Sequence, residues 1–319
     1  MDLMQCFDRM AHSVTSLCSQ RLGVSKNVTD TMISTISNMR HYIRTAYGDS
    51  DSSCGSDGKI LQGSIQGNAA ASPMFVAITC VLLNFLESFV QGFHIQTVIT
   101  LTILSIAVVM YVDDTDLLVS SKSYSESLFF LISRMQKSVK KWRKGVIQTG
   151  GALRPYKCKW FLISFKWLQG KWKYGSISED PVRLYLRNSN GNKIEIERLE
   201  VTQGLTGLGV CIAPDGNQMD QINDFMNVKP GQEEKITQWI NNVRSKYLRP
   251  HDVCLSAFRS IFKSIEYVLP ATSMSETETK LIETKLYKVM LPRMGVARNI
   301  SLPYRYSPKR YQGLGCLEI

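Results

Sequence analysis

The sequence predicts a mixed α+β domain followed by a smaller helical domain, on the basis of three observations. Apolar residues recur at three- and four-residue steps in several segments, which is the period of an amphipathic helix. Segments 156–174 and 182–199 alternate apolar and polar residues around a Gln-Gly and an Asn-Gly dipeptide, as β-hairpins do. Strand signals stop after about Asp215, and helical patterns follow.

The individual elements are predicted in chain order. In the first part we expect helices over 3–24, 29–47, 72–90 and 125–145, a loop over 48–60, strands within 95–120, and the two hairpins. In the second part we expect helices over 232–247, 251–269 and 275–290. The last helix begins with Ser275 followed three residues later by Glu278, which is the pattern of a capping box.

One apolar segment could be read as a membrane helix or as strands. From Ile95 to Val112 the only strongly polar side chain is Gln96, and these 18 residues are near the lower limit of about 17 for a spanning helix. The segment is rich in β-branched residues and ends on two aspartates. We therefore expect buried strands here, and no membrane partner.

Composition limits the class of protein. The 319 residues are 44% hydrophobic, enough for one large or two modest domains with cores. Lys and Arg number 38 against 27 Asp and Glu, and the net charge of +11 favours a polyanionic partner, with a merely basic protein as the alternative. The 8 cysteines and 4 histidines are scattered, so neither a zinc module nor a disulfide framework is indicated. The charged N-terminus does not fit a signal peptide, and we expect an intracellular protein.

Adjacent aspartates, Asp113 and Asp114, interrupt the apolar stretch VVMYVDDTDLLVS at 108–120. A pair of Asp residues in a turn is commonly just solvated. Because the flanking residues are apolar, however, we expect the turn to emerge from a buried sheet, where neighbouring carboxylates need protonation or a cation. Mg²⁺ prefers such oxygen ligands, and two Mg²⁺ ions about 4 Å apart can bind the attacking and leaving oxygens of a phosphoryl transfer.

Several motifs resemble those of reverse transcriptases of the non-LTR retrotransposon type. Tyr111-Val-Asp-Asp114 matches the Tyr-x-Asp-Asp box of this family, and Asp2 with Phe7 five residues later matches its earlier acidic motif. Four further elements follow in the family's order: Gln66-Gly67 before Ser72-Pro73 with one extra Ala, Gly151–Lys157, Leu208-Gly209, and Tyr311–Gly315. Each element alone is weak, but their order and spacing agree over nearly the whole chain.

The resemblance implies a fold and an activity. It implies a polymerase palm over residues 1–217, an antiparallel sheet packed on helices, and a helical thumb-like region over 218–319. The implied activity is RNA-directed DNA synthesis, in which a dNTP is added to a primer 3′-hydroxyl on an RNA template. Two Mg²⁺ ions, or Mn²⁺ in their place, are implied as cofactors, with Asp2 and Asp113 as ligands of both and Asp114 as a weaker or outer ligand.

Roles for other residues follow from the same resemblance. Tyr111 is expected against the primer end, and Phe7 under the sugar of the incoming nucleotide, where it would exclude a 2′-hydroxyl; a core phenylalanine is the alternative. Gln66 and Gly67 are expected to touch the template and the nascent base pair, although a loop glycine explains Gly67 equally simply. Lys157 is expected to protonate the leaving pyrophosphate, or else to be a surface lysine.

A basic tract is the strongest charge feature of the chain. No Asp or Glu occurs between Glu126 and Glu179, while twelve Lys and Arg residues do, interleaved with aromatic residues. The residues that we expect to contact nucleic acid are Lys140, Lys141, Arg143, Lys144, Arg154, Lys159, Lys166, Lys171 and Lys173. Strand alternation would turn the aromatic side chains towards the core and the lysines towards solvent. We expect both to hold in part: several tryptophans point inward, and the positive face still contacts nucleic acid.

The chain departs from the family in its first residues. Asp2 is the second residue, so the strand that should hold it has almost no preceding residues, and the family's fingers are missing. We therefore expect palm and thumb to fold but this chain alone to be inactive. Two alternatives remain: a nucleic-acid-binding remnant without catalysis, and a viral-type RNA-dependent RNA polymerase. The viral class is less favoured because it usually has Gly at the position of Val112 and lacks an aromatic residue at that of Phe7.

Overall fold

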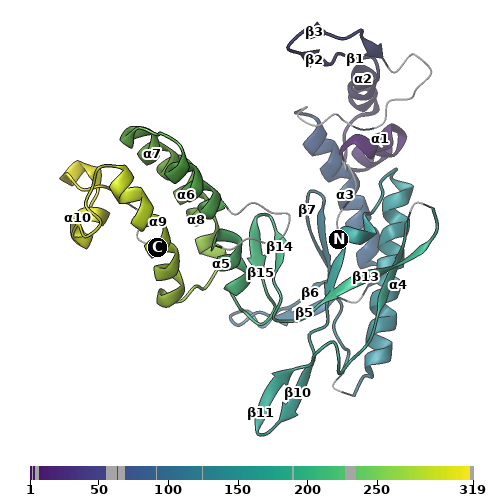
Figure 1. The fold of residues 1–319 in the computed structure, drawn as a ribbon. Coiled ribbons are helices and arrows are strands. Elements are labelled where there is room, and N and C mark those ends of the chain that lie inside the picture. The colour runs from purple at the N-terminus through teal and green to yellow at the C-terminus, as the bar shows by residue number, and fades with distance from the viewer. Residues whose placement is uncertain are drawn as a thin grey trace. The chain divides into compact units, whose positions relative to one another are not determined.

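The computed structural model describes residues 1, 3, 7–54, 63, 69–90, 92–123, 125–188, 190–226 and 235–316. The chain forms two compact units, one of Met1–Trp160 with Asp180–Arg198 and one of Phe161–Glu179 with Leu199–Ile319 (Figure 1). Both combine helices with small antiparallel sheets, so the predicted α+β class is confirmed. The boundary between palm and thumb at 217/218 concerns polymerase subdomains and stays a prediction.

Helices and short strands alternate in the first unit. Its helical elements are η1 (Phe7–Arg9), α1 (His12–Arg21), α2 (Lys26–Ser37), α3 (Ala71–Glu87), α4 (Leu128–Gln148) and η2 (Pro155–Lys157). Its strands are β1 (Arg40–His41), β2 (Arg44–Thr45), β3 (Gly48–Asp49), β4 (Ser53–Cys54), β5 (Phe93–Gln96), β6 (Ile103–Ile106), β7 (Val108–Tyr111), β8 (Asp114–Leu117), β9 (Lys159–Phe161), β12 (Leu184–Arg187) and β13 (Lys193–Leu199). Helix α3 packs against both α1 and α4, and buried Ile78, Leu86 and Trp142 fill the core.

A three-stranded sheet, β12-β13-β9, lies against α4. The amide side chain of Gln136 on α4 accepts a hydrogen bond from the Tyr185 N–H and donates one to the Tyr185 carbonyl, each at 2.8 Å. Leu184 and Leu186 point to the buried face of β12, as the alternation predicted. The hairpin predicted around the Asn-Gly dipeptide at 190–191 is confirmed as β12–β13.

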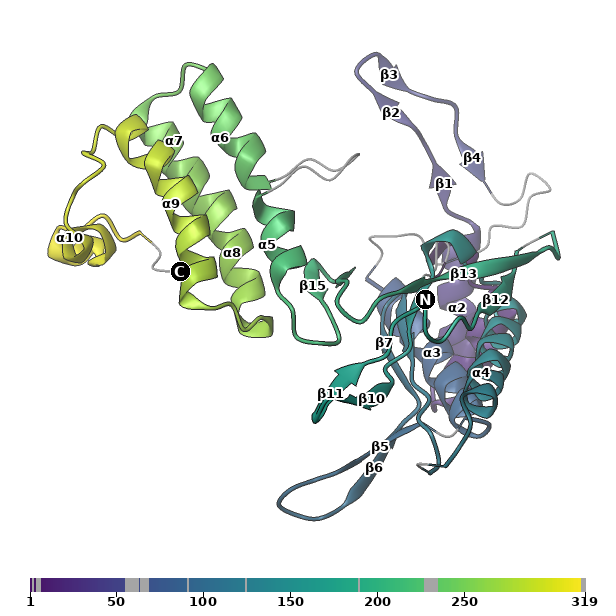
Figure 2. The ribbon, with the colours of Figure 1, turned by 60° about the horizontal axis from the view of Figure 1, so that its bottom comes forward.

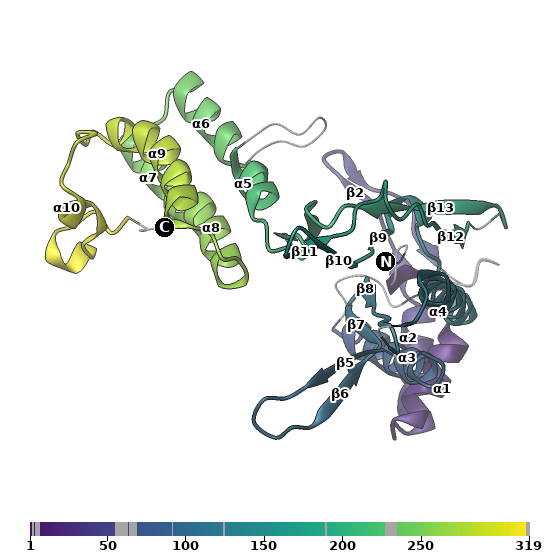
Figure 3. The same cartoon turned by 90° about the horizontal axis from the view of Figure 1, so that it is seen from below.

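The apolar segment around 95–112 forms strands, as predicted, but the prediction that these strands are buried is wrong for β5 and β6. Among the described strands the two pair only with each other, and the side chains of Val98 and Ile99 between them are 92% and 93% exposed. In Figures 2 and 3 this hairpin extends from the body of the first unit, and the described part of that unit places no second layer over it. Within the described ranges, no helix is long and apolar enough to cross a membrane.

The helix predicted over 29–47 ends early. Helix α2 stops at Ser37, and the side chain of Asn38 donates to the Ser34 carbonyl at 2.9 Å. The chain then enters the short strand pairs β1–β4 and β2–β3, in which Arg44 donates to Asp49 at 2.8 Å. The spacing of apolar residues does not show where this helix ends, because the end is set by local side-chain hydrogen bonds and not by burial.

The second unit contains two hairpins and a helical bundle. Its elements are β10 (Phe165–Leu168), β11 (Lys171–Tyr174), β14 (Leu205–Gly207), β15 (Val210–Ile212), α5 (Met219–Met226), α6 (Lys235–Ser245), α7 (Pro250–Ser256), the π-helical turn η3 (Ala257–Ile261), α8 (Phe262–Val268), η4 (Leu269–Ala271), α9 (Glu276–Arg293), α10 (Leu302–Tyr306) and η5 (Lys309–Tyr311). Helices α6 to α9 share one core around Ile240, Ile265 and Leu286 (Figure 2). The capping box predicted at Ser275 and Glu278 is confirmed.

Candidate functional site

The two aspartates of the Tyr-x-Asp-Asp box lie at the tip of the β7–β8 hairpin. Tyr111 pairs with Asp114, so the turn consists of Val112 and Asp113. The backbone φ of Val112 is +53°. A positive φ at the first turn residue is the pattern of a type II′ turn, which prefers Gly, and a β-branched residue is strained there. This strain was not predicted from the sequence.

One face of the β7–β8 hairpin is exposed and the other is buried. In β8, exposed Asp114 and Asp116 alternate with buried Thr115 and Leu117. Asp113 is exposed as well. The expectation of a carboxylate pair in a buried setting is therefore wrong: both side chains are exposed, and water screens the repulsion between them.

The residues on either side of Asp2 pair with this turn. The Leu3 N–H donates to the Asp113 carbonyl at 3.3 Å, and the Thr115 N–H donates to the Met1 carbonyl at 3.0 Å. Leu3 also forms an antiparallel bridge with Leu153, which belongs to the predicted Gly151–Lys157 element. Three segments that carry predicted motifs thus meet at their backbones. Asp2 itself lies outside the described residues.

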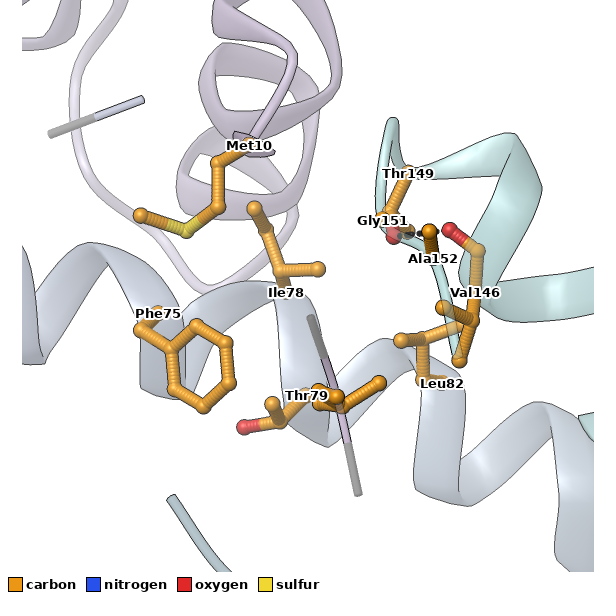
Figure 4. A pocket seen from close by; sticks show the side chains of 10 residues that line it. Met10, Phe75, Ile78, Thr79, Leu82, Val146, Thr149, Gly151 and Ala152 are labelled. Atoms are coloured by element: carbon orange, nitrogen blue, oxygen red, sulfur yellow. Dashed lines mark hydrogen bonds between the residues drawn. The ribbon is translucent and has the colours of Figure 1, made fainter. Parts of the chain in front are cut away.

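Beneath this meeting point is a small apolar cavity. Its lining includes Leu3, Met10, Phe75, Ile78 and Val146, and Figure 4 shows how several of these side chains converge from different elements. The cavity measures about 20 Å³, which is room for about one water molecule. It is therefore part of the packing that supports the motif segments and is too small for a nucleotide.

Phe7 is half-buried, and its ring lies 5.1 Å from that of Phe75 on α3. This contact fits a packing role and leaves part of the ring accessible. Beside it lies Gly63, whose N–H donates to the Met10 carbonyl at 2.8 Å. A Cβ at Gly63 would come within 2.5 Å of the Asp8 backbone, so only glycine fits at this position.

Gly63 is a residue that the sequence analysis missed. The available signal was the repeated Gln-Gly dipeptide, at 62–63 and again at 66–67. Gln66 and Gly67 lie outside the described residues, so their predicted contacts with template and base pair stay predictions. Lys157 is exposed at the end of η2, and its role as a general acid also stays a prediction.

The basic tract is less free of acidic partners than its sequence indicates. Lys159 pairs with Glu197, and Lys166 lies 3.5 Å from Glu179. Arg143 donates to the Arg187 carbonyl at 2.8 Å and so fixes the end of β12. The tract holds no acid of its own, but its fold brings acids and carbonyl groups from outside to these three residues.

The other members of the tract are distributed over several elements. Lys140, Lys141 and Lys144 are exposed along α4, and the Lys141 ammonium lies 4.0 Å from the centre of the Phe89 ring. Lys171 and Lys173 are exposed on β11, and Arg154 is half-buried before η2. These side chains retain the exposure that a phosphate contact requires.

Carboxylate oxygens on an exposed turn are suitable ligands for a hard divalent cation such as Mg²⁺. Asp113 and Asp114 supply such oxygens at the β7–β8 turn. Within the described ranges, no three His, Cys, Asp or Glu side chains come together closely enough to hold a metal ion.

No protein-family model matches the chain, and no curated protein matches its sequence.

Proposed function

We propose that this chain contains the palm of an RNA-directed DNA polymerase of reverse-transcriptase type, with a thumb-like helical region after it. The observation that supports the proposal is the backbone pairing of Met1 and Leu3 with Thr115 and Asp113. A two-metal polymerase needs carboxylates on neighbouring strands. The backbone hydrogen bonds place residues 1 and 3, on either side of Asp2, next to the Tyr-x-Asp-Asp turn.

Each residue of the proposed site would have its own role. Asp113 and Asp2 would hold two Mg²⁺ ions, or Mn²⁺, with Asp114 as an outer ligand. When bound, the two ions would activate the primer 3′-hydroxyl and stabilise charge on the leaving pyrophosphate. Tyr111, exposed beside Asp114 on the same face, would support the primer end. Lys157 would donate a proton to the pyrophosphate.

A second candidate is nucleic-acid binding without catalysis. It is favoured by the exposed lysines Lys140, Lys141 and Lys144 on α4, which need no metal site to act. The viral-type RNA-dependent polymerase stays a third possibility. The glycine that this class usually has would be unstrained at the positive φ of position 112. The aromatic ring of Phe7, however, disfavours the viral class.

The direct test is incorporation of labelled dNTPs on an RNA template with a DNA primer, in the presence of Mg²⁺. It is made with this chain and with a version extended at its N-terminus by the fingers that the activity requires. We expect activity in the extended chain and its loss, by about a thousandfold or more, in Asp113→Asn, since a metal ligand is removed. Asp116→Asn is the matched control, because Asp116 is an exposed carboxylate of the same strand outside the motif.

The possible results of this assay distinguish the three candidate functions. If the extended chain incorporates no dNTP, or if Asp113→Asn and Asp116→Asn behave alike, the catalytic proposal fails. If both chains nevertheless bind template–primer with an affinity that falls steeply with salt, the non-catalytic candidate replaces it. If rNTPs are incorporated as well as dNTPs, the viral-type alternative is favoured.

A further inference from the structure

The β10–β11 hairpin of the second unit carries a row of aromatic side chains on one face. Phe165 pairs with Tyr174 and Trp167 pairs with Trp172 across the two strands. The ring centres are 5.0 Å apart in the first pair and 5.1 Å apart in the second. Because side chains alternate along a strand, all four rings lie on the same face.

These four rings are exposed rather than buried. Their exposed fractions lie between 41% and 66%. Among the described helices and strands, no other element packs extensively on β10 or β11, which are drawn in Figure 1 as a separate two-stranded ribbon. The expectation that alternation turns the tryptophans towards a core is therefore wrong for Trp167 and Trp172. The cross-strand ring pairs stabilise the hairpin, but each ring still exposes 41–66% of its surface, and such a cluster of exposed rings indicates a binding partner.

The charge of the hairpin identifies the class of partner. Lys166, Lys171 and Lys173 occupy the face opposite the rings, and segment 161–178 contains no Asp or Glu. Glu179 directly follows this segment, and its carboxylate lies 3.5 Å from the Lys166 ammonium. A two-stranded ribbon is narrow, and lysine side chains are long enough to present their ammonium groups at its edges. Exposed rings beside several cations fit a polyanion with aromatic groups.

We propose that the aromatic face of the β10–β11 hairpin binds single-stranded nucleic acid by stacking unpaired bases on its rings. In a duplex, each base is covered on both sides by its neighbours, whereas the bases of a single strand have free faces. The two ring pairs are two residues apart along the strands, about 7 Å. One base can therefore stack at each pair while the lysines contact the phosphates.

This proposal does not depend on the catalytic proposal. It concerns unpaired strand, whereas the turn at Asp113 is proposed to act on a paired primer end. The hairpin belongs to the second unit and the turn to the first. Loss of one activity by mutation therefore leaves the other measurable in the same protein.

The test compares single-stranded and double-stranded probes. Fluorescence anisotropy is measured with a labelled oligothymidine of about 20 nucleotides and with a blunt duplex of the same length, using the full chain. In Trp167→Ala/Trp172→Ala, we expect the Kd for the single strand to rise at least about tenfold, since stacking contributes to the affinity for each base. The Kd for the duplex should change less than about twofold. Intrinsic tryptophan fluorescence of the wild type should be quenched by the single strand.

Two variants isolate the cause. Trp167→Phe/Trp172→Phe keeps aromatic faces and should bind the single strand within about threefold of wild type. Phe129→Ala/Phe130→Ala removes another exposed ring pair, on α4, and should leave binding unchanged. Circular dichroism establishes that each variant is folded.

Three results would overturn the proposal. The first is unchanged affinity of the double alanine variant for the single strand. The second is an equal loss for single strand and duplex. The third is self-association of the wild type that the same variant abolishes, because the aromatic face would then be an interface between copies of the chain.

Discussion

The hairpins β7–β8 and β10–β11 have the same length and the same two-residue connection, yet their surroundings differ. Thr115 and Leu117 bury one face of β7–β8, and Met1 and Leu3 bond to its turn. Neither face of β10–β11 is buried to that degree, and lysines and aromatic rings cover it. One hairpin therefore places a few side chains at a fixed point, while the other offers a surface. The difference lies in what packs on each hairpin: Met1, Leu3 and α3 contact β7–β8, and no described helix or strand packs extensively on β10–β11.

The largest expected effect concerns the support of β7–β8. Leu3→Ala removes a buried side chain beside the apolar cavity and should lower the free energy of unfolding by about 2–4 kcal/mol. Leu168→Ala removes a leucine that is 45% exposed on β10 and should cost less than about 1 kcal/mol. Urea unfolding of each variant measures both values. Equal costs would show that the two hairpins are supported alike.

A buried hydroxyl gives the next test. Thr115 is buried, and its Oγ1 has no hydrogen-bond partner among the described residues. Thr115→Val replaces this group by a methyl of similar size and should raise the free energy of unfolding by about 1 kcal/mol. Thr206→Val is the control, because Thr206 is exposed and donates to Asp224 at 3.5 Å, and it should not stabilise. A loss of stability in Thr115→Val would mean that the hydroxyl is bonded after all.

The two turns supply a smaller effect. Val112→Gly relieves the strain of a β-branched residue at positive φ, which is offset in part by the greater freedom of glycine in the unfolded chain. We expect a net gain of about 0.5–1 kcal/mol in thermal or urea unfolding. Gln169→Gly at the β10–β11 turn, where Gln169 and Gly170 both have positive φ as in a type I′ turn, should gain less because Gln is not β-branched. The reverse order would contradict the strain at Val112.

The smallest effect is electrostatic. The pKa of Glu179 lies below its ordinary value, chiefly because the Ser176 N–H donates to its carboxylate and secondly because Lys166 is near. A lowered pKa adds stability at pH values above the ordinary pKa of the carboxyl, and this stability is lost as the pH falls through the lowered value. In an NMR titration, Lys166→Ala should raise the pKa of Glu179 only part of the way towards its ordinary value, because the hydrogen bond from Ser176 remains. Arg183→Ala, which removes the partner of Glu195 instead, should leave it unchanged. Complete return to the ordinary value in Lys166→Ala would contradict the role of the Ser176 N–H.

Much of the local structure was predictable from the sequence. The turns at Gln169-Gly170 and around Asn190-Gly191, the long helix predicted over 72–90, and the capping box at Ser275 all follow from short patterns, and the structure confirms them. These features depend on residues that are close in the chain, so periodicity and turn chemistry suffice. Only part of the candidate site followed in this way. The β7–β8 turn was predicted, while the strain at Val112 and the tight approach of Gly63 were not.

The sequence by itself determined the turns of the β7–β8, β10–β11 and β12–β13 hairpins, the helical core stripes and the positions of the acidic and basic groups along the chain, because each is a local pattern. Only the tertiary structure decided which of these groups meet. It paired Met1 with Thr115, which lies 114 positions away, brought Glu197 to Lys159, and left both the β5–β6 strands and the tryptophans of β10–β11 exposed. The physical reason is that burial and pairing between distant segments depend on what packs on each face, and the alternation of a strand is the same whether or not a second layer covers it.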